Sequence, residues 1–149
     1  MWEFNGLPLH PLIVHAAVVF GPLAALSGIL YGLWGARRDQ LRWVTMSLVT
    51  IAFLSIWAAY LSGDNYFESD RFARVGGDLK EKIEHHEELA GVLRWITTGF
   101  FAVTALAVWQ HARTGATRYA LGGLVVVAAV LTLIWVAMTG DAGSQAVYG

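Results

Sequence analysis

The residues that could perform chemistry gather in a few short segments of the sequence. Two histidines lie near the start, two are adjacent in the middle, and two aspartates each follow a glycine: His10 and His15, His85 and His86, Gly63-Asp64 and Gly140-Asp141. Imidazole nitrogens and carboxylate oxygens bind metal ions and carry protons. The chain has no cysteine, which excludes disulfides, thiolate metal sites and cysteine nucleophiles. The side chains therefore indicate a haem, a metal ion or proton handling, provided that the fold brings them together.

The elements that must position these residues are four apolar stretches. Of the 149 residues, 56% are hydrophobic and 14% are charged, against about a quarter charged in soluble domains. A spanning helix needs about 20 mainly apolar residues. Such stretches cover residues 11–34, 43–63, 89–110 and 119–140, and the connection over residues 62–88 carries a helical extension from about residue 79. The sequence predicts an all-α, four-transmembrane-helix up-down bundle that forms one membrane domain, residues 1–149.

The basic residues predict which way this bundle faces. The two short connections, residues 35–42 and 111–118, contain five arginines and one aspartate, whereas residues 62–88 contain four basic and eight acidic residues. Short connections dense in Lys and Arg stay in the cytoplasm. We therefore predict a protein in contact with the lipid bilayer, with the two short connections in the cytoplasm and the N and C termini both on the outer face.

This topology collects most of the ionisable residues at the outer membrane face. The candidate ligands there are His10, His15, His86, Asp64 and Asp141, with Arg94 two turns deeper. At about 100° per residue, His10 and His15 are about 140° apart on a helix, too far to serve one ligand together. His15 and His86 are the preferred pair, with His10 as the substitute. His85 turns toward an acidic helix face, and His111 lies alone at the opposite membrane face.

Three interpretations of this site stay open. Two histidines on opposite sides of a bundle suit the axial positions of a b-type haem, with an aspartate orienting an imidazole and an arginine meeting the propionates. Three arginines could bind the haem propionates: Arg71, Arg74 and Arg94. A second interpretation has the histidines and aspartates bind zinc, copper or iron directly. In the third, the same side chains only hydrogen-bond one another and hold the bundle together.

Several functional classes lack support in the sequence. It contains no Gly-x-Ser-x-Gly turn, no phosphate-binding glycine loop and no His-Glu-x-x-His helix, so we expect no enzyme by itself. Nucleic-acid binding would need a basic exposed face. The sequence favours a haem-binding electron-transfer or accessory redox subunit, with a metal-binding protein or a non-catalytic structural subunit as the alternatives. Each of these functions is compatible with a redox partner or another partner in a membrane complex, and with a homo-oligomer.

The chain also resembles a known family, the small bacterial four-helix membrane proteins of domain of unknown function 2231. The resemblance is carried by three segments: Gly6-Leu7-Pro8-Leu9-His10-Pro11-Leu12-Ile13-Val14-His15, His86-Glu87-Glu88-Leu89-Ala90-Gly91, and the ending from Gly140-Asp141 to Tyr148-Gly149. Many members of that family have a histidine where this chain has Asp141. The resemblance implies a cytoplasmic-membrane protein without an assigned reaction, whose four helices with paired histidines are distantly similar to the cytochrome b561 type.

Overall fold

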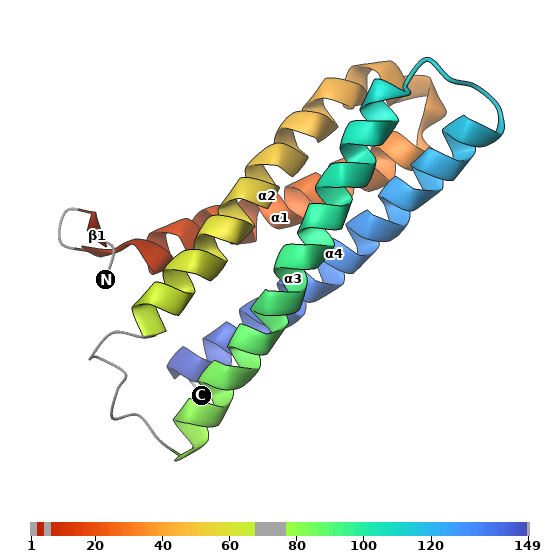
Figure 1. Ribbon diagram of the computed structural model, residues 1–149. Coiled ribbons are helices and arrows are strands. Elements are labelled where there is room, and N and C mark those ends of the chain that lie inside the picture. The colour runs from red at the N-terminus through yellow and green to blue at the C-terminus, as the bar shows by residue number, and fades with distance from the viewer. Residues whose placement is uncertain (1–2, 5–6, 68–76, 149) are drawn as a thin grey trace.

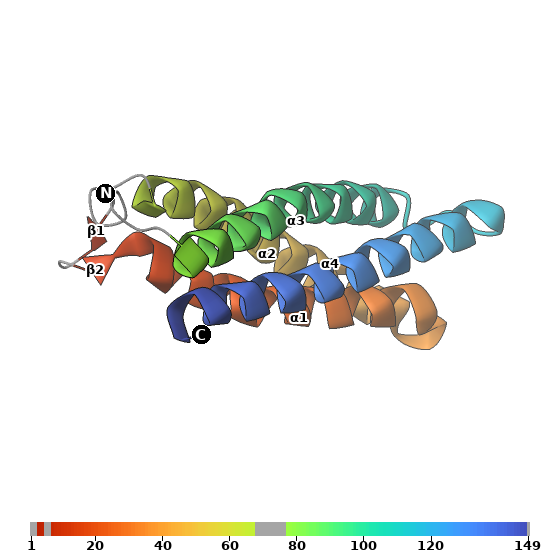
Figure 2. The same ribbon diagram turned by 90° about the horizontal axis from the view of Figure 1, so that it is seen from below.

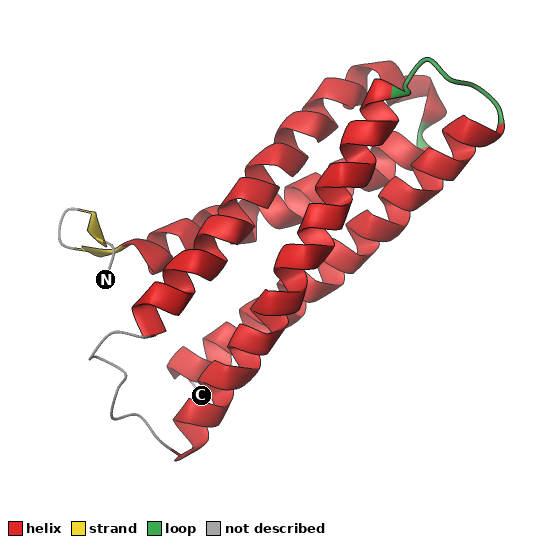
Figure 3. Ribbon diagram, viewed as in Figure 1, coloured by secondary structure: helices red, strands yellow, loops and turns green. Residues whose placement is uncertain are grey.

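The chain folds almost entirely into helix (Figure 3). The computed structural model describes residues 3–4, 7–67 and 77–148, and the side chains of residues 13–61, 81 and 84–142. A two-stranded antiparallel hairpin, β1 (Glu3–Phe4) and β2 (Leu7–Pro8), precedes α1 (Leu9–Leu33). The 3-10 helix η1 (Gly35–Arg37) leads into α2 (Arg38–Phe67), and α3 (Gly77–Trp109) and α4 (Ala116–Tyr148) complete the order.

Four segments are long and apolar enough to cross a membrane: Ile13–Leu33, Gly35–Leu61, Glu84–Trp109 and Ala116–Ala142. Their large apolar side chains point outward as well as inward, with Leu33 71% and Leu54 60% exposed. Such surface is unfavourable in water and favourable against lipid chains. The prediction of a four-helix transmembrane bundle is thereby confirmed.

The helices run alternately up and down. Figure 1 places the α1–α2 and α3–α4 connections at one end of the bundle, here called the loop end, and both chain ends at the other, the termini end. Helix α1 packs against α2 and α4, and α3 packs against the same two helices (Figure 2). Helices α1 and α3 therefore lie diagonally across the bundle.

Small residues allow the helices to approach closely in the core. Ala24, Ala25, Ala52 and Ala129 are completely buried, and Phe100 fills the space that Gly28 leaves, since a Cβ there would lie 2.9 Å from its Cζ. In lipid the hydrophobic effect does not drive helices together, so close packing of this kind stabilises their association instead.

The backbones of α1 and α4 approach each other closely at Gly32. A Cβ on Gly32 would lie 2.8 Å from the carbonyl oxygen of Gly122 and would collide with Val126. Overpacking in a well-packed core typically costs about 1–3 kcal/mol. We expect Gly32→Ala to lower the thermal stability of the detergent-purified protein by this amount. Gly99→Ala is the control, because nothing lies within 4 Å of its added methyl group, and equal losses in both variants would contradict the assigned contact.

Candidate functional site

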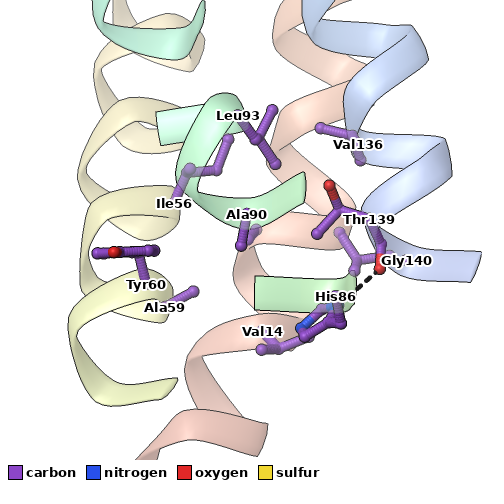
Figure 4. Close-up of a pocket in the computed structure, with 12 residues that line it drawn as sticks. Val14, Ile56, Ala59, Tyr60, His86, Ala90, Leu93, Val136, Thr139 and Gly140 are labelled. Carbon is purple, nitrogen blue, oxygen red and sulfur yellow. Dashed lines mark hydrogen bonds between the residues drawn. The ribbon is translucent and has the colours of Figure 1, made fainter. Parts of the chain in front are cut away.

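His86 is the predicted ligand that the structure places most clearly. It lies on α3 at the termini end, where its Nδ1 is 2.9 Å from the carbonyl oxygen of Thr139 on α4 (Figure 4). Because a carbonyl only accepts hydrogen bonds, Nδ1 carries the proton and donates it. In the neutral ring the lone pair is then on Nε2. A backbone carbonyl that fixes the tautomer in this way is typical of histidines that ligate metals.

The His86 ring lines a small cavity to which all four helices contribute. Its walls are almost entirely apolar, and its volume is about 70 Å³. The lining residues are Val14, Ala17 and Val18 of α1, Ile56, Ala59 and Tyr60 of α2, His86, Ala90 and Leu93 of α3, and Val136, Thr139 and Gly140 of α4. Figure 4 shows His86 between Val14 on one side and Thr139 on the other.

The cavity contains one polar atom that lacks a hydrogen bond. Among the described residues, the Thr139 hydroxyl is buried and has no hydrogen-bond partner. An unsatisfied buried hydroxyl costs about 1–3 kcal/mol, which a water molecule or a ligand in the cavity would recover. The cavity therefore offers an oriented imidazole nitrogen and an unpaired hydroxyl between apolar walls.

The other predicted ligands do not line this cavity. His15 and Asp141 are exposed, and neither belongs to its lining. The side chains of His10 and Asp64, and the residues Arg71 and Arg74, lie outside what the structure describes. No group of three or more histidine, aspartate or glutamate side chains suited to a metal ion occurs among the described residues. The structure thus brings one imidazole of the predicted set into the cavity.

Arg94 is surrounded by aromatic rings. Its guanidinium lies 4.1 Å from the ring centre of Tyr60, 5.3 Å from that of Trp57 and 5.2 Å from that of Trp95, while its Nε donates to the carbonyl of Gly91 at 3.2 Å. A charge within a span needs such partners, because hydrocarbon does not solvate it. Tyr60 also lines the cavity, so Arg94 contacts a residue of the cavity wall.

The loop end holds a second polar site, centred on His111. Its Nε2 lies 2.6 Å from Oδ1 of Asp39, and its Nδ1 lies 2.8 Å from the hydroxyl of Tyr31. His111 is 8% exposed and Tyr31 is 1% exposed, whereas the Asp39 side chain is 87% exposed. A carboxylate only accepts, so Nε2–H donates to Asp39 and Nδ1 of the neutral ring accepts from Tyr31.

Arg38 completes this network. Its Nη1 donates to the backbone carbonyl of His111 at 2.8 Å, and its guanidinium lies 5.2 Å from the ring centre of Tyr31. The network joins α1, α2 and the α3–α4 connection. The sequence predicted a solitary His111, and the signal that could have identified its partner was Asp39, the one acidic residue in the two arginine-rich connections.

Comparison with known proteins identifies the family. No curated protein and no solved structure matches the chain. The family described as "Predicted membrane protein (DUF2231)" matches residues 6–149, which include all four helices. The match agrees with the four spanning segments and with the resemblance carried by the sequence motifs. The chain therefore belongs to this family of predicted membrane proteins.

Proposed function

We propose that the protein is an accessory membrane subunit for electron transfer, in which His86 ligates the iron of a haem b at the termini end. The observation that carries the proposal is the hydrogen bond from Nδ1 of His86 to Thr139, which leaves the lone pair on Nε2 of a ring that lines a cavity between the helices. Neutral histidine nitrogens are the usual axial ligands of b-type haem. Cofactor sites in helical bundles are built in this way, from side chains of facing helices.

The composition of the cavity favours haem over a bare ion. The porphyrin supplies the equatorial nitrogens, so the protein needs to provide only axial ligands. One described imidazole and apolar walls suit this arrangement, whereas a bare transition-metal ion needs several protein ligands. Arg94 is close enough to the cavity, behind Tyr60, to be the candidate partner of a propionate.

The cavity volume favours the second candidate, a divalent transition-metal ion. A space of about 70 Å³ holds an ion with a few waters, and it is far smaller than pockets for organic ligands, which measure about 300–1,000 Å³. In this alternative His86 and waters bind the ion, with His10, Asp64 or Asp141 adding ligands. Haem would require α1 and α2 to separate from α3 and α4 at the termini end.

A spectrum of the purified protein tests the two candidates. The protein is purified in mild detergent, supplied with hemin, separated from excess hemin and examined by visible spectroscopy and metal analysis. A Soret band that corresponds to stoichiometric haem, and that shifts when dithionite reduces the iron, supports haem. A bound transition metal without a Soret band supports the ion. The absence of both would leave a non-catalytic structural subunit and overturn the proposal.

The second axial ligand is a separate prediction. His15 is exposed, whereas Val14 beside it lines the cavity, and His10 precedes Val14 by four positions, the spacing of residues on one helix face. We therefore expect His10→Ala to convert a six-coordinate, low-spin haem spectrum into a five-coordinate, high-spin one. His15→Ala should leave the spectrum unchanged. The reverse result would restore His15 as the ligand that the sequence favoured.

The location and orientation belong to the same proposal. We infer an inner-membrane protein with both termini outside, because the two connections at the loop end contain five arginines. Reporter fusions at the C terminus distinguish the two orientations. Activity of an alkaline phosphatase fusion, which requires export, supports the inference, and fluorescence of a cytoplasmic reporter at the same position contradicts it.

A further inference from the structure

The loop end carries a large excess of positive charge. Five arginines lie in residues 35–42 and 111–118, and the single carboxylate there, Asp39, accepts a hydrogen bond from His111. Among the described residues, no ion pair joins a carboxylate to one of these arginines, and the oxygen Oδ1 of Asp39 accepts from His111. The arginines are therefore available to an external anion.

Two of these arginines line a polar cavity of about 230 Å³ at this end. Arg38 enters from the start of α2 and Arg118 from the first turns of α4. Gly32, Gly35 and Gly122 line the cavity as well. A Cβ on Gly35 would lie 2.8 Å from Nη2 of Arg118, which shows that this guanidinium extends from α4 toward η1.

The two guanidiniums are held in place by aromatic rings. Arg38 lies over Tyr31 and donates to the carbonyl of His111, and Arg118 lies 5.5 Å from the ring centre of Tyr119. Stacked guanidiniums keep their hydrogen-bonding edges available. Paired arginines bind phosphate oxygens through charge-assisted and often bidentate hydrogen bonds.

The surroundings of the cavity match the headgroup level of a membrane. Large exposed aromatic residues mark the loop ends of the helices: Trp34, Trp43, Trp109 and Tyr119. Tryptophan and tyrosine concentrate at the membrane interface. Leu33 and Tyr119, each 71% exposed, also line the cavity, so an acyl chain could leave it along an apolar surface.

The geometry points to a binding site for the phosphate group of an anionic phospholipid, held by Arg38 and Arg118 between α1 and α4. Basic pockets between spanning helices bind acidic headgroups in this way. A free phosphate ion shares the chemistry of the headgroup, but the exposed apolar surface beside the cavity favours the lipid. The site lies at the opposite end from the His86 cavity and does not depend on its cofactor.

Native mass spectrometry of the detergent-solubilised protein tests this site, with phosphatidylglycerol and phosphatidylcholine added in equal amounts. We expect the wild type to retain phosphatidylglycerol preferentially, and Arg118→Gln to weaken that retention about fivefold, as loss of one basic contact predicts. Arg118→Lys, which keeps the charge but loses the planar fork of the guanidinium, should lose less of the preference than Arg118→Gln. The matched control is Arg113→Gln, which removes the same charge from an exposed arginine that donates to Gln110 instead of lining the cavity.

Three results would overturn the inference. Equal weakening in Arg113→Gln and Arg118→Gln would indicate general attraction to a basic end. Equal retention of the two lipids by the wild type would exclude a headgroup site. Displacement of phosphatidylglycerol by millimolar inorganic phosphate would assign the cavity to a free anion in place of a lipid. Circular dichroism of each variant verifies that the helices remain intact.

Discussion

His86→Ala is expected to abolish the Soret band of the hemin-supplied protein. The imidazole that it removes is the one described nitrogen ligand in the cavity, and its orientation depends on the hydrogen bond to Thr139. The remaining described walls offer no second imidazole, the usual ligand of a b-type haem. The matched control is His85→Ala, because His85 is the neighbouring histidine on α3 and is exposed. His85→Ala should bind haem as the wild type does.

Rescue separates a ligand from a merely structural histidine. Truncation of His86 leaves a space in the cavity about the size of the lost ring, and free imidazole can occupy it. We expect millimolar imidazole to restore a six-coordinate haem spectrum in His86→Ala. Haem retained in full by His86→Ala without imidazole would refute the ligand assignment. Loss of the helical circular dichroism signal would instead show that His86→Ala had unfolded. In that case the same test uses His86→Gln, which keeps a polar group near the Thr139 carbonyl.

The membrane fold could be predicted because one physical requirement determines it. A segment that crosses lipid must satisfy its own backbone hydrogen bonds over about 20 residues without charges. Long uncharged runs such as Ile13–Leu33 leave no other solution. The connections are too short for consecutive helices to run parallel, so the helices alternate up and down. His86, Ala90 and Leu93 follow one another at steps of three or four positions, the spacing of one helix face, and all three line the cavity.

The partners of the polar residues could not be predicted, because they depend on contacts between distant parts of the chain. His111 bonds to residues 72 and 80 positions away. No periodicity links such positions, so the sequence predicted only that His111 lies alone at the opposite membrane face. Arg94 presents the same difficulty: its neighbours include Trp57 and Tyr60 on another helix, and their identity follows from how α2 packs against α3.

His111→Ala is expected to cause the largest loss of stability among single substitutions at the loop end. The substitution removes a buried ring and leaves the Tyr31 hydroxyl, on a residue 1% exposed, without its partner. An unsatisfied buried hydroxyl and the loss of packing together predict about 2–4 kcal/mol. Thermal unfolding of the purified protein in detergent measures this loss. His85→Ala serves again as the control, since it removes an exposed histidine from α3, at the other end of the bundle.

A double-mutant cycle shows whether the loss arises from the network. Tyr31→Phe alone should cost about 1 kcal/mol, because Nδ1 of His111 then loses its donor. In the His111→Ala background, Tyr31→Phe should cost nothing or recover stability, because it removes the hydroxyl that had become unpaired. Strictly additive losses would show that Tyr31 and His111 contribute independently. A direct Tyr31–His111 hydrogen bond predicts that Tyr31→Phe destabilises the wild type but does not destabilise His111→Ala.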